Sequence, residues 1–150
     1  SHANSIHKIY ICGMQSVRHM QRGDIVVIYR TGDDVAPARF RAVASTICVV
    51  EKIKHIDEFK NEQEFIKYCL KFSVFTEREL KEFYNSKRYP YIIRFSYNIS
   101  LPRRPNRGSL IDQVGLNGSP GFRWGCFELT NEQFYEILRL GSVDESFIVH

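Results

Sequence analysis

The sequence of 150 residues predicts a mixed α/β (α+β) fold built on a small, partly closed sheet. Two observations lead to this prediction. Short runs rich in β-branched and aromatic residues recur along the chain and end at glycine or proline, as strands do. Between them lie segments whose apolar residues recur at the helical period and which open with a capping-box pattern. Strands and helices therefore alternate in a chain of ordinary domain length.

Five segments are predicted to be strands: residues 8–12, 24–29, 40–51, 89–99 and 122–129. The run at 24–29 is almost continuously apolar, which is typical of a central strand covered on both faces. The next segment is expected to pair with it as a hairpin. In the last segment, Gly125 interrupts the strand pattern.

Helix starts are marked by capping residues. Ser16 is predicted to cap a short helical turn, and Gly23 to end it in a left-handed conformation. Three longer helices are expected to begin after the N-cap residues Asn61, Thr76 and Thr130. Residues 101–121 are rich in proline and glycine and predict a long loop, a kind of segment that often carries function in compact domains.

The composition indicates an ordinary globular domain, with 43% hydrophobic and 25% charged residues. The apolar runs are far shorter than the ~20 residues needed to span a bilayer, and no secretory signal pattern opens the chain. Four scattered cysteines without zinc-ligand spacing predict small buried hydrophobes in a reducing compartment. We therefore expect a soluble, cytoplasmic protein with no membrane partner, no metal and no cofactor.

The domain boundaries are expected to be simple. Residues 1–7 are interpreted as an added or disordered N-terminal tail, and residues 8–150 as one domain, which can be part of a longer protein.

The net charge of +4 is modest, but the charges are unevenly distributed. No acidic residue occurs between Glu82 and Asp112. The same window holds six basic residues: Lys87, Arg88, Arg94, Arg103, Arg104 and Arg107. The last three lie on the proline-flanked loop and are predicted to contact a nucleic-acid backbone. The alternative for them is a solvated basic loop.

Motifs for catalysis are not found in the sequence. It contains no nucleophile elbow, phosphate-binding glycine loop or dinucleotide fingerprint, and its five histidines show no paired spacing. His19, beside Arg18, is a candidate site residue, against the alternative of an ordinary surface histidine. These observations favour binding over catalysis.

The order of motifs carries a resemblance. A short turn with Ser16 and Arg18 precedes Gly23-Asp24 and an apolar strand ending in Tyr29, and residues 127–138 close the pattern. This order resembles the PUA-like superfamily, closest to its EVE branch, with ASCH and YTH-type domains as further relatives. The chain departs from the EVE pattern in its longer helices between residues 56 and 85, and in residues 15–18, which replace a Trp-containing turn.

The resemblance implies a PUA-like open β-barrel of five to six strands flanked by helices, with a pocket that receives a nucleobase, often a modified one. The function implied is a reader that binds RNA, DNA or a modified nucleotide, within a chain that can carry other domains. Two alternatives stay open. One is an ASCH-type hydrolase acting on nucleosides or RNA, although the lysine-plus-glutamate arrangement associated with that branch cannot be recognised in this sequence. The other is a protein-interaction module.

The residue chemistry fits such a pocket, because unstacked bases are held by aromatic faces and by hydrogen bonds to their edges. Trp124, the only tryptophan, is predicted to form a stacking wall, against the alternative that it belongs to the core. Tyr29 offers a second aromatic ring at the end of its strand. The predicted ligand-binding residues are Ser16, Arg18, Tyr29, Arg30, Thr31, Arg123 and Trp124.

Overall fold

A computed structural model describes residues 7–32 and 37–144 of the chain. Its contacts divide the chain into two compact units. Unit 1 comprises Ser1–Val26 and Cys48–Asn98, and unit 2 comprises Val27–Ile47 and Ile99–His150. Residues 1–6 of the predicted N-terminal tail lie outside the described residues. Both that tail and the single-domain organisation stay predictions.

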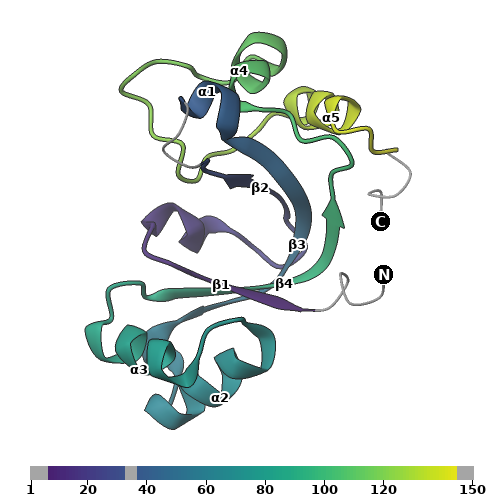
Figure 1. Cartoon of the computed structure of the whole chain (residues 1–150). Coiled ribbons are helices and arrows are strands. Elements are labelled where there is room, and N and C mark those ends of the chain that lie inside the picture. The colour runs from purple at the N-terminus through teal and green to yellow at the C-terminus, as the bar shows by residue number, and fades with distance from the viewer. Residues whose placement is uncertain (1–6, 33–36, 145–150) are drawn as a thin grey trace. The chain divides into compact units, whose positions relative to one another are not determined.

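The described strands form one antiparallel sheet in the order β1-β4-β3-β2 (Figure 1). The strands are β1 (Lys8–Cys12), β2 (Ile25–Arg30), β3 (Val43–His55) and β4 (Tyr91–Ser100). Strand β1 pairs with β4 in a register that sets Tyr10 opposite Ile93. The mixed α+β class is confirmed. The described sheet is not closed, so the barrel stays a prediction.

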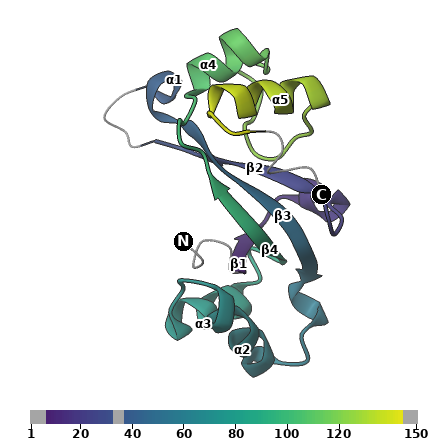
Figure 2. The ribbon, with the colours of Figure 1, turned by 90° about the vertical axis from the view of Figure 1, so that its right-hand side faces the viewer.

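Unit 1 packs two helices against its part of the sheet. Helix α2 (Glu62–Phe72) and helix α3 (Glu77–Ser86) lie side by side in both views (Figures 1 and 2). The predicted caps are confirmed, since Asn61 and Thr76 each accept a backbone N–H from the third residue of their helix. The buried core of unit 1 includes a cluster of Ile9, Ile56, Phe59, Phe65, Ile66, Cys69, Leu80 and Ile92.

Unit 2 has short helical elements and one longer helix. Its elements are α1 (Ala38–Arg41), α4 (Arg107–Ser109), a π-helical turn (Leu110–Val114) and α5 (Asn131–Leu140). The predicted capping box of Thr130 and Gln133 is present at the start of α5. The core of unit 2 consists of Ala44, Ile47, Leu101, Leu110, Val114, Leu116, Ile137 and Leu138.

Strand β2 corrects one prediction. It lies at the edge of the described sheet, not in its centre, and residues 26–29 are half-buried. The apolar run at 24–29 predicts a central strand covered on both faces. Its hairpin pairing with β3 holds, but β3 pairs on its other side with β4, which leaves β2 outermost.

The predicted strand at 122–129 is wrong, because this segment is irregular in the structure. Its aromatic residues pack on one another instead of joining a ladder. The rings of Phe122 and Phe127 lie 5.0 Å apart, and those of Trp124 and Phe127 lie 5.7 Å apart. Aromatic residues favour strands and loop clusters alike, so composition alone does not separate the two.

Three local boundaries also differ from expectation. The segment predicted as strand 40–51 begins with the end of α1, and β3 then continues to His55. The turn Gln15–His19 is a 3-10 helix whose N-cap residue is Met14, so Ser16 is not its cap. The 101–121 segment contains α4 and the π-helical turn as well as loop.

Gly23 is confirmed in a left-handed conformation with φ +92°. No described helix is long and apolar enough to cross a bilayer.

Candidate functional site

Three of the predicted site residues meet in unit 2, in what we call the aromatic cluster: Tyr29, Trp124 and Arg107. The Tyr29 and Trp124 ring centroids lie 5.0 Å apart with the rings tilted by 37°. The Arg107 guanidinium carbon lies over the indole, 4.7 Å from the ring centroid. This is the geometry of a cation–π contact. Arg107 therefore covers the Trp124 ring in the structure. The sequence predicts a different role for Arg107, a contact from the loop with a nucleic-acid backbone.

Local structure explains how these residues are placed. Side chains alternate along a strand, so Val27 and Tyr29 share the face of β2 that packs against the unit 2 core. Arg107 opens α4, and its backbone N–H donates to Ala42 O at 2.8 Å. At the next position, a Cβ on Gly108 would lie 3.1 Å from Arg39 Cγ. Glycine thus lets α4 approach α1 closely.

Two polar atoms of the aromatic cluster are buried. Trp124 Nε1 has no hydrogen-bond partner among the described residues. The Tyr29 hydroxyl lies near enough to Arg107 for the positive charge to lower its pKa, yet no hydrogen bond of ordinary geometry forms. Burial is the larger effect, and it raises the pKa of Tyr29. Leaving buried donors unpaired costs roughly 1–3 kcal/mol each, so the cluster has hydrogen-bonding capacity that the protein itself does not use.

Trp124 lies at the margin of the core rather than wholly inside it. It is half-buried, and it packs against the unit 2 core as well as against Phe127. Phe127 itself is 36% exposed. The two roles weighed for Trp124 are therefore both represented in its contacts, and mutation has to separate them.

The other predicted arginines of unit 2 are exposed: Arg30, Arg103, Arg104 and Arg123. Arg104 donates to the Ser100 hydroxyl at 3.2 Å. No described carboxylate lies within ion-pairing distance of Arg103, Arg104 or Arg107. Two cations of unit 1 from the same acid-free window do pair: Lys87 with Asp57 at 3.2 Å and Arg94 with Glu51 at 3.7 Å. The loop arginines are thus left available to an anion.

Three predicted site residues remain: Thr31, Ser16 and Arg18. Thr31 follows β2 and is exposed. Ser16 and Arg18 belong to unit 1, where both are exposed on the Gln15–His19 turn. Their participation in one site with Trp124 stays a prediction.

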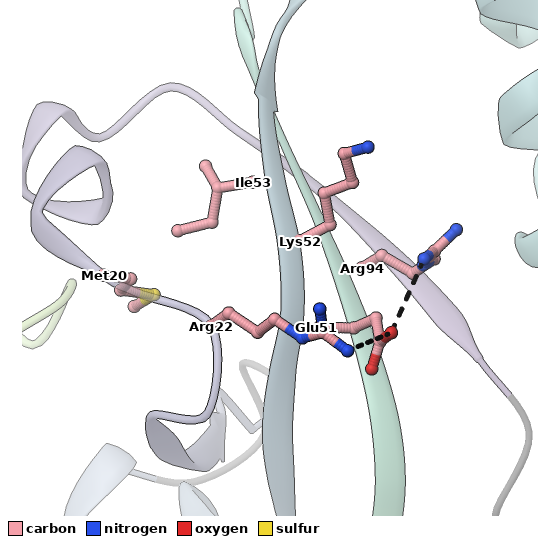
Figure 3. Close-up of a pocket in the computed structure, with 6 residues that line it drawn as sticks. All are labelled: Met20, Arg22, Glu51, Lys52, Ile53 and Arg94. Carbon is pink, nitrogen blue, oxygen red and sulfur yellow. Dashed lines mark ion pairs between the residues drawn. The ribbon is translucent and has the colours of Figure 1, made fainter.

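Sequence reasoning did not find a charged hollow in unit 1. It has a volume of about 410 Å³ and is lined by Met20, Arg22, Glu51, Lys52, Ile53 and Arg94. Figure 3 shows the Glu51 carboxylate between the two guanidinium groups, with both ion pairs at 3.7 Å. These residues come from three separate segments, so no spacing in the sequence signals their proximity.

The cysteine thiols and the possible metal ligands give little support to a catalytic site. Burial raises the pKa of Cys48 to about 11 and that of Cys69 to about 12, which keeps both thiols protonated and poorly nucleophilic. In the described ranges, no group of three or more His, Cys, Asp or Glu residues is arranged to hold a metal ion.

Comparison of the chain with family models, with curated proteins and with solved structures finds no match. The resemblance to the PUA-like superfamily therefore stays a prediction based on motif order.

Proposed function

We propose that the chain is a reader domain that binds single-stranded nucleic acid by stacking one base, standard or modified, on Trp124. The observation that carries this proposal is the Arg107 guanidinium lying over the indole without a described carboxylate partner. Arg107 covers a surface that a base would take. When a base replaces it there, the guanidinium becomes available to a phosphate.

The exchange is favoured by the contact that the released guanidinium gains. A cation–π contact is worth about 0.5–1 kcal/mol at an exposed site and about 2 kcal/mol when desolvated, and Arg107 and Trp124 are both half-buried. Stacking of a base on an aromatic side chain is worth about 1–3 kcal/mol. The released guanidinium can then form a charge-assisted hydrogen bond with a phosphate oxygen. Binding therefore replaces one contact with two. The buried Tyr29 hydroxyl is a further donor for the edge of the base.

Arg103 and Arg104 are exposed and lie close to Arg107 in the sequence. They can contact the phosphates of the nucleic-acid backbone on either side of the stacked base. Phosphate contacts of this kind provide affinity without sequence preference. A PUA-like open barrel that presents the base, and a reducing, cytoplasmic setting for its four cysteine thiols, belong to the same proposal. The order of motifs around Gly23-Asp24 supports the first, and the scattered, mostly buried cysteines support the second.

Trp124 is the only tryptophan, so its fluorescence reports directly on the proposed contact. Titration with single-stranded RNA and DNA, duplex DNA and modified nucleosides should quench the emission with single-stranded ligands and not with duplex. Arg107→Gln should weaken oligonucleotide binding. Arg139→Gln is the matched control, because Arg139 is ion-paired with Glu136 on α5. Unchanged emission with every ligand, together with no binding by anisotropy, would disprove the proposal.

The alternative of a hydrolase is tested in the same samples. Chromatography of the nucleosides and RNA after incubation should recover only the starting material. Product formation that is lost on a single Lys or Glu substitution would replace the reader function with an ASCH-type activity.

A further inference from the structure

The hollow in unit 1 carries more positive than negative charge. Arg22 lies just before β2, Glu51 and Lys52 are neighbours on β3, and Arg94 belongs to β4. Three cations and one carboxylate thus line the hollow. Figure 3 shows Arg22 and Arg94 on either side of Glu51, while Lys52 extends away from that carboxylate. An excess of two positive charges remains in the hollow.

Arg22 keeps most of its hydrogen-bonding capacity, and Arg94, which also interacts with the Tyr68 hydroxyl, keeps part of its own. Both lie 3.7 Å from the same oxygen, Glu51 Oε1, whereas direct charge-assisted hydrogen bonds measure about 2.7–2.9 Å. Arg94 Nε is buried and has no hydrogen-bond partner among the described residues. Glu51 therefore holds the two groups near each other electrostatically without using their fork of donors.

Arg94 is fixed in position by aromatic side chains of α2. Its guanidinium carbon lies 5.1 Å from the Phe72 ring centroid and 5.8 Å from that of Tyr68. The side chain is only 21% exposed. A guanidinium that is already immobilised loses little conformational entropy when it binds a ligand, so its donors are prepared for one particular position.

We propose that this hollow binds the phosphate monoester of a small organic molecule. A planar guanidinium pair matches phosphate oxygens, and the excess of two positive charges balances a monoester dianion. The volume of about 410 Å³ exceeds the space that a phosphate alone needs and falls in the range of small-molecule sites. Met20 and Ile53 provide apolar lining for the organic part of the ligand. The site lies wholly within unit 1 and does not depend on the aromatic cluster of unit 2.

Glu51 gives the proposal a test with a distinctive sign. In a purely structural ion pair, Glu51→Gln would change only stability. In a phosphate site, the same variant removes a competing anion and frees both arginines. Calorimetric titration with ribose 5-phosphate, a monoester without a base, and with inorganic phosphate should show binding to the natural chain, and binding about tenfold tighter to Glu51→Gln, because one unfavourable charge contact is lost.

Arg22→Gln should weaken monophosphate binding about tenfold or more, and it is expected to fold normally because the Arg22 side chain is 79% exposed. Lys60→Gln is the matched control, since Lys60 is an exposed cation of unit 1 outside the hollow. Thermal melting confirms that each variant is folded. A sugar monophosphate has no base to stack on Trp124, so its binding separates this proposal from the one for unit 2.

The proposal is overturned if no monophosphate binds at millimolar concentration, or if Arg22→Gln and Glu51→Gln bind it as the natural chain does. Binding of a single-stranded oligonucleotide at the hollow with no binding of either monophosphate would assign the arginines to a phosphodiester and refute the monoester. Tighter binding to Glu51→Gln with weaker binding to Arg22→Gln supports the site.

Discussion

Replacing Trp124 with alanine separates its two possible roles, as a wall for a ligand and as part of the core. Truncating a fully buried tryptophan costs about 3–5 kcal/mol of unfolding free energy. Trp124 is half-buried, so we expect about half of that cost, roughly 2 kcal/mol. For a chain of 150 residues this corresponds to a fall in melting temperature of roughly 6 °C.

We expect Trp124→Ala to reduce the affinity for the ligand by more than its loss of folding stability can explain. Loss of one base stack is worth about 1–3 kcal/mol, or roughly 5- to 150-fold in affinity. Fluorescence anisotropy of a labelled single-stranded oligonucleotide measures this change in a variant that has no tryptophan. Trp124→Phe keeps an aromatic face and should recover most of the affinity. Melting followed by circular dichroism reports the stability of the same samples.

Leu138→Ala provides the comparison for a true core position, because Leu138 is 1% exposed in unit 2. It should lower stability by about 2–5 kcal/mol and leave the affinity per folded molecule unchanged. If Trp124→Ala behaves in the same way, with a large loss of stability and unchanged affinity, Trp124 belongs to the core and the proposed stacking is refuted. Tyr29 would then be the stronger aromatic candidate.

Three further predictions test other parts of the structure. Replacing Arg103, Arg104 and Arg107 together with glutamine should weaken binding to all single-stranded sequences alike and reduce the slope of log K against log salt by about 2, as loss of three phosphate contacts requires; an unchanged slope in anisotropy titrations would assign these arginines to a solvated surface. Iodoacetamide should modify the half-buried Cys126 well before Cys48 and Cys69, whose raised pKa values and burial protect them until the protein unfolds, and mass spectrometry of a time course would show equal rates if this is wrong. Thr76→Ala should cost about 1 kcal/mol of stability because it removes the cap of α3, whereas Ser16→Ala, which removes no cap, should cost much less in the same denaturant titration.

Much of the helical structure could be predicted from the sequence, because a helix start is decided within four residues. The caps at Asn61, Thr76 and Thr130 depend on a side chain and a backbone N–H three positions apart, and all three are present. The left-handed conformation of Gly23 is equally local. The mixed α+β class followed from the alternation of such local signals.

The sheet was predictable only in part, because strand partners are set by residues far apart in the chain. The hairpin of β2 and β3 is expected from their succession, but β3 also pairs with β4, which leaves β2 at the edge, although helices α2 and α3 separate β3 from β4 in the sequence. The same holds for residues 122–129, where packing among Phe122, Trp124 and Phe127 replaced the expected ladder.

The candidate sites divide in the same way. The sequence by itself determined which residue types offer stacking and phosphate contacts, and so singled out Tyr29, Trp124 and the loop arginines. Only the tertiary structure decided that Arg107 covers Trp124, and that Arg22 and Arg94 meet across Glu51. The chemistry of an aromatic or charged side chain follows from its residue type. Its contacts depend on which distant segments pack together when the chain folds, and a local sequence pattern does not contain that information.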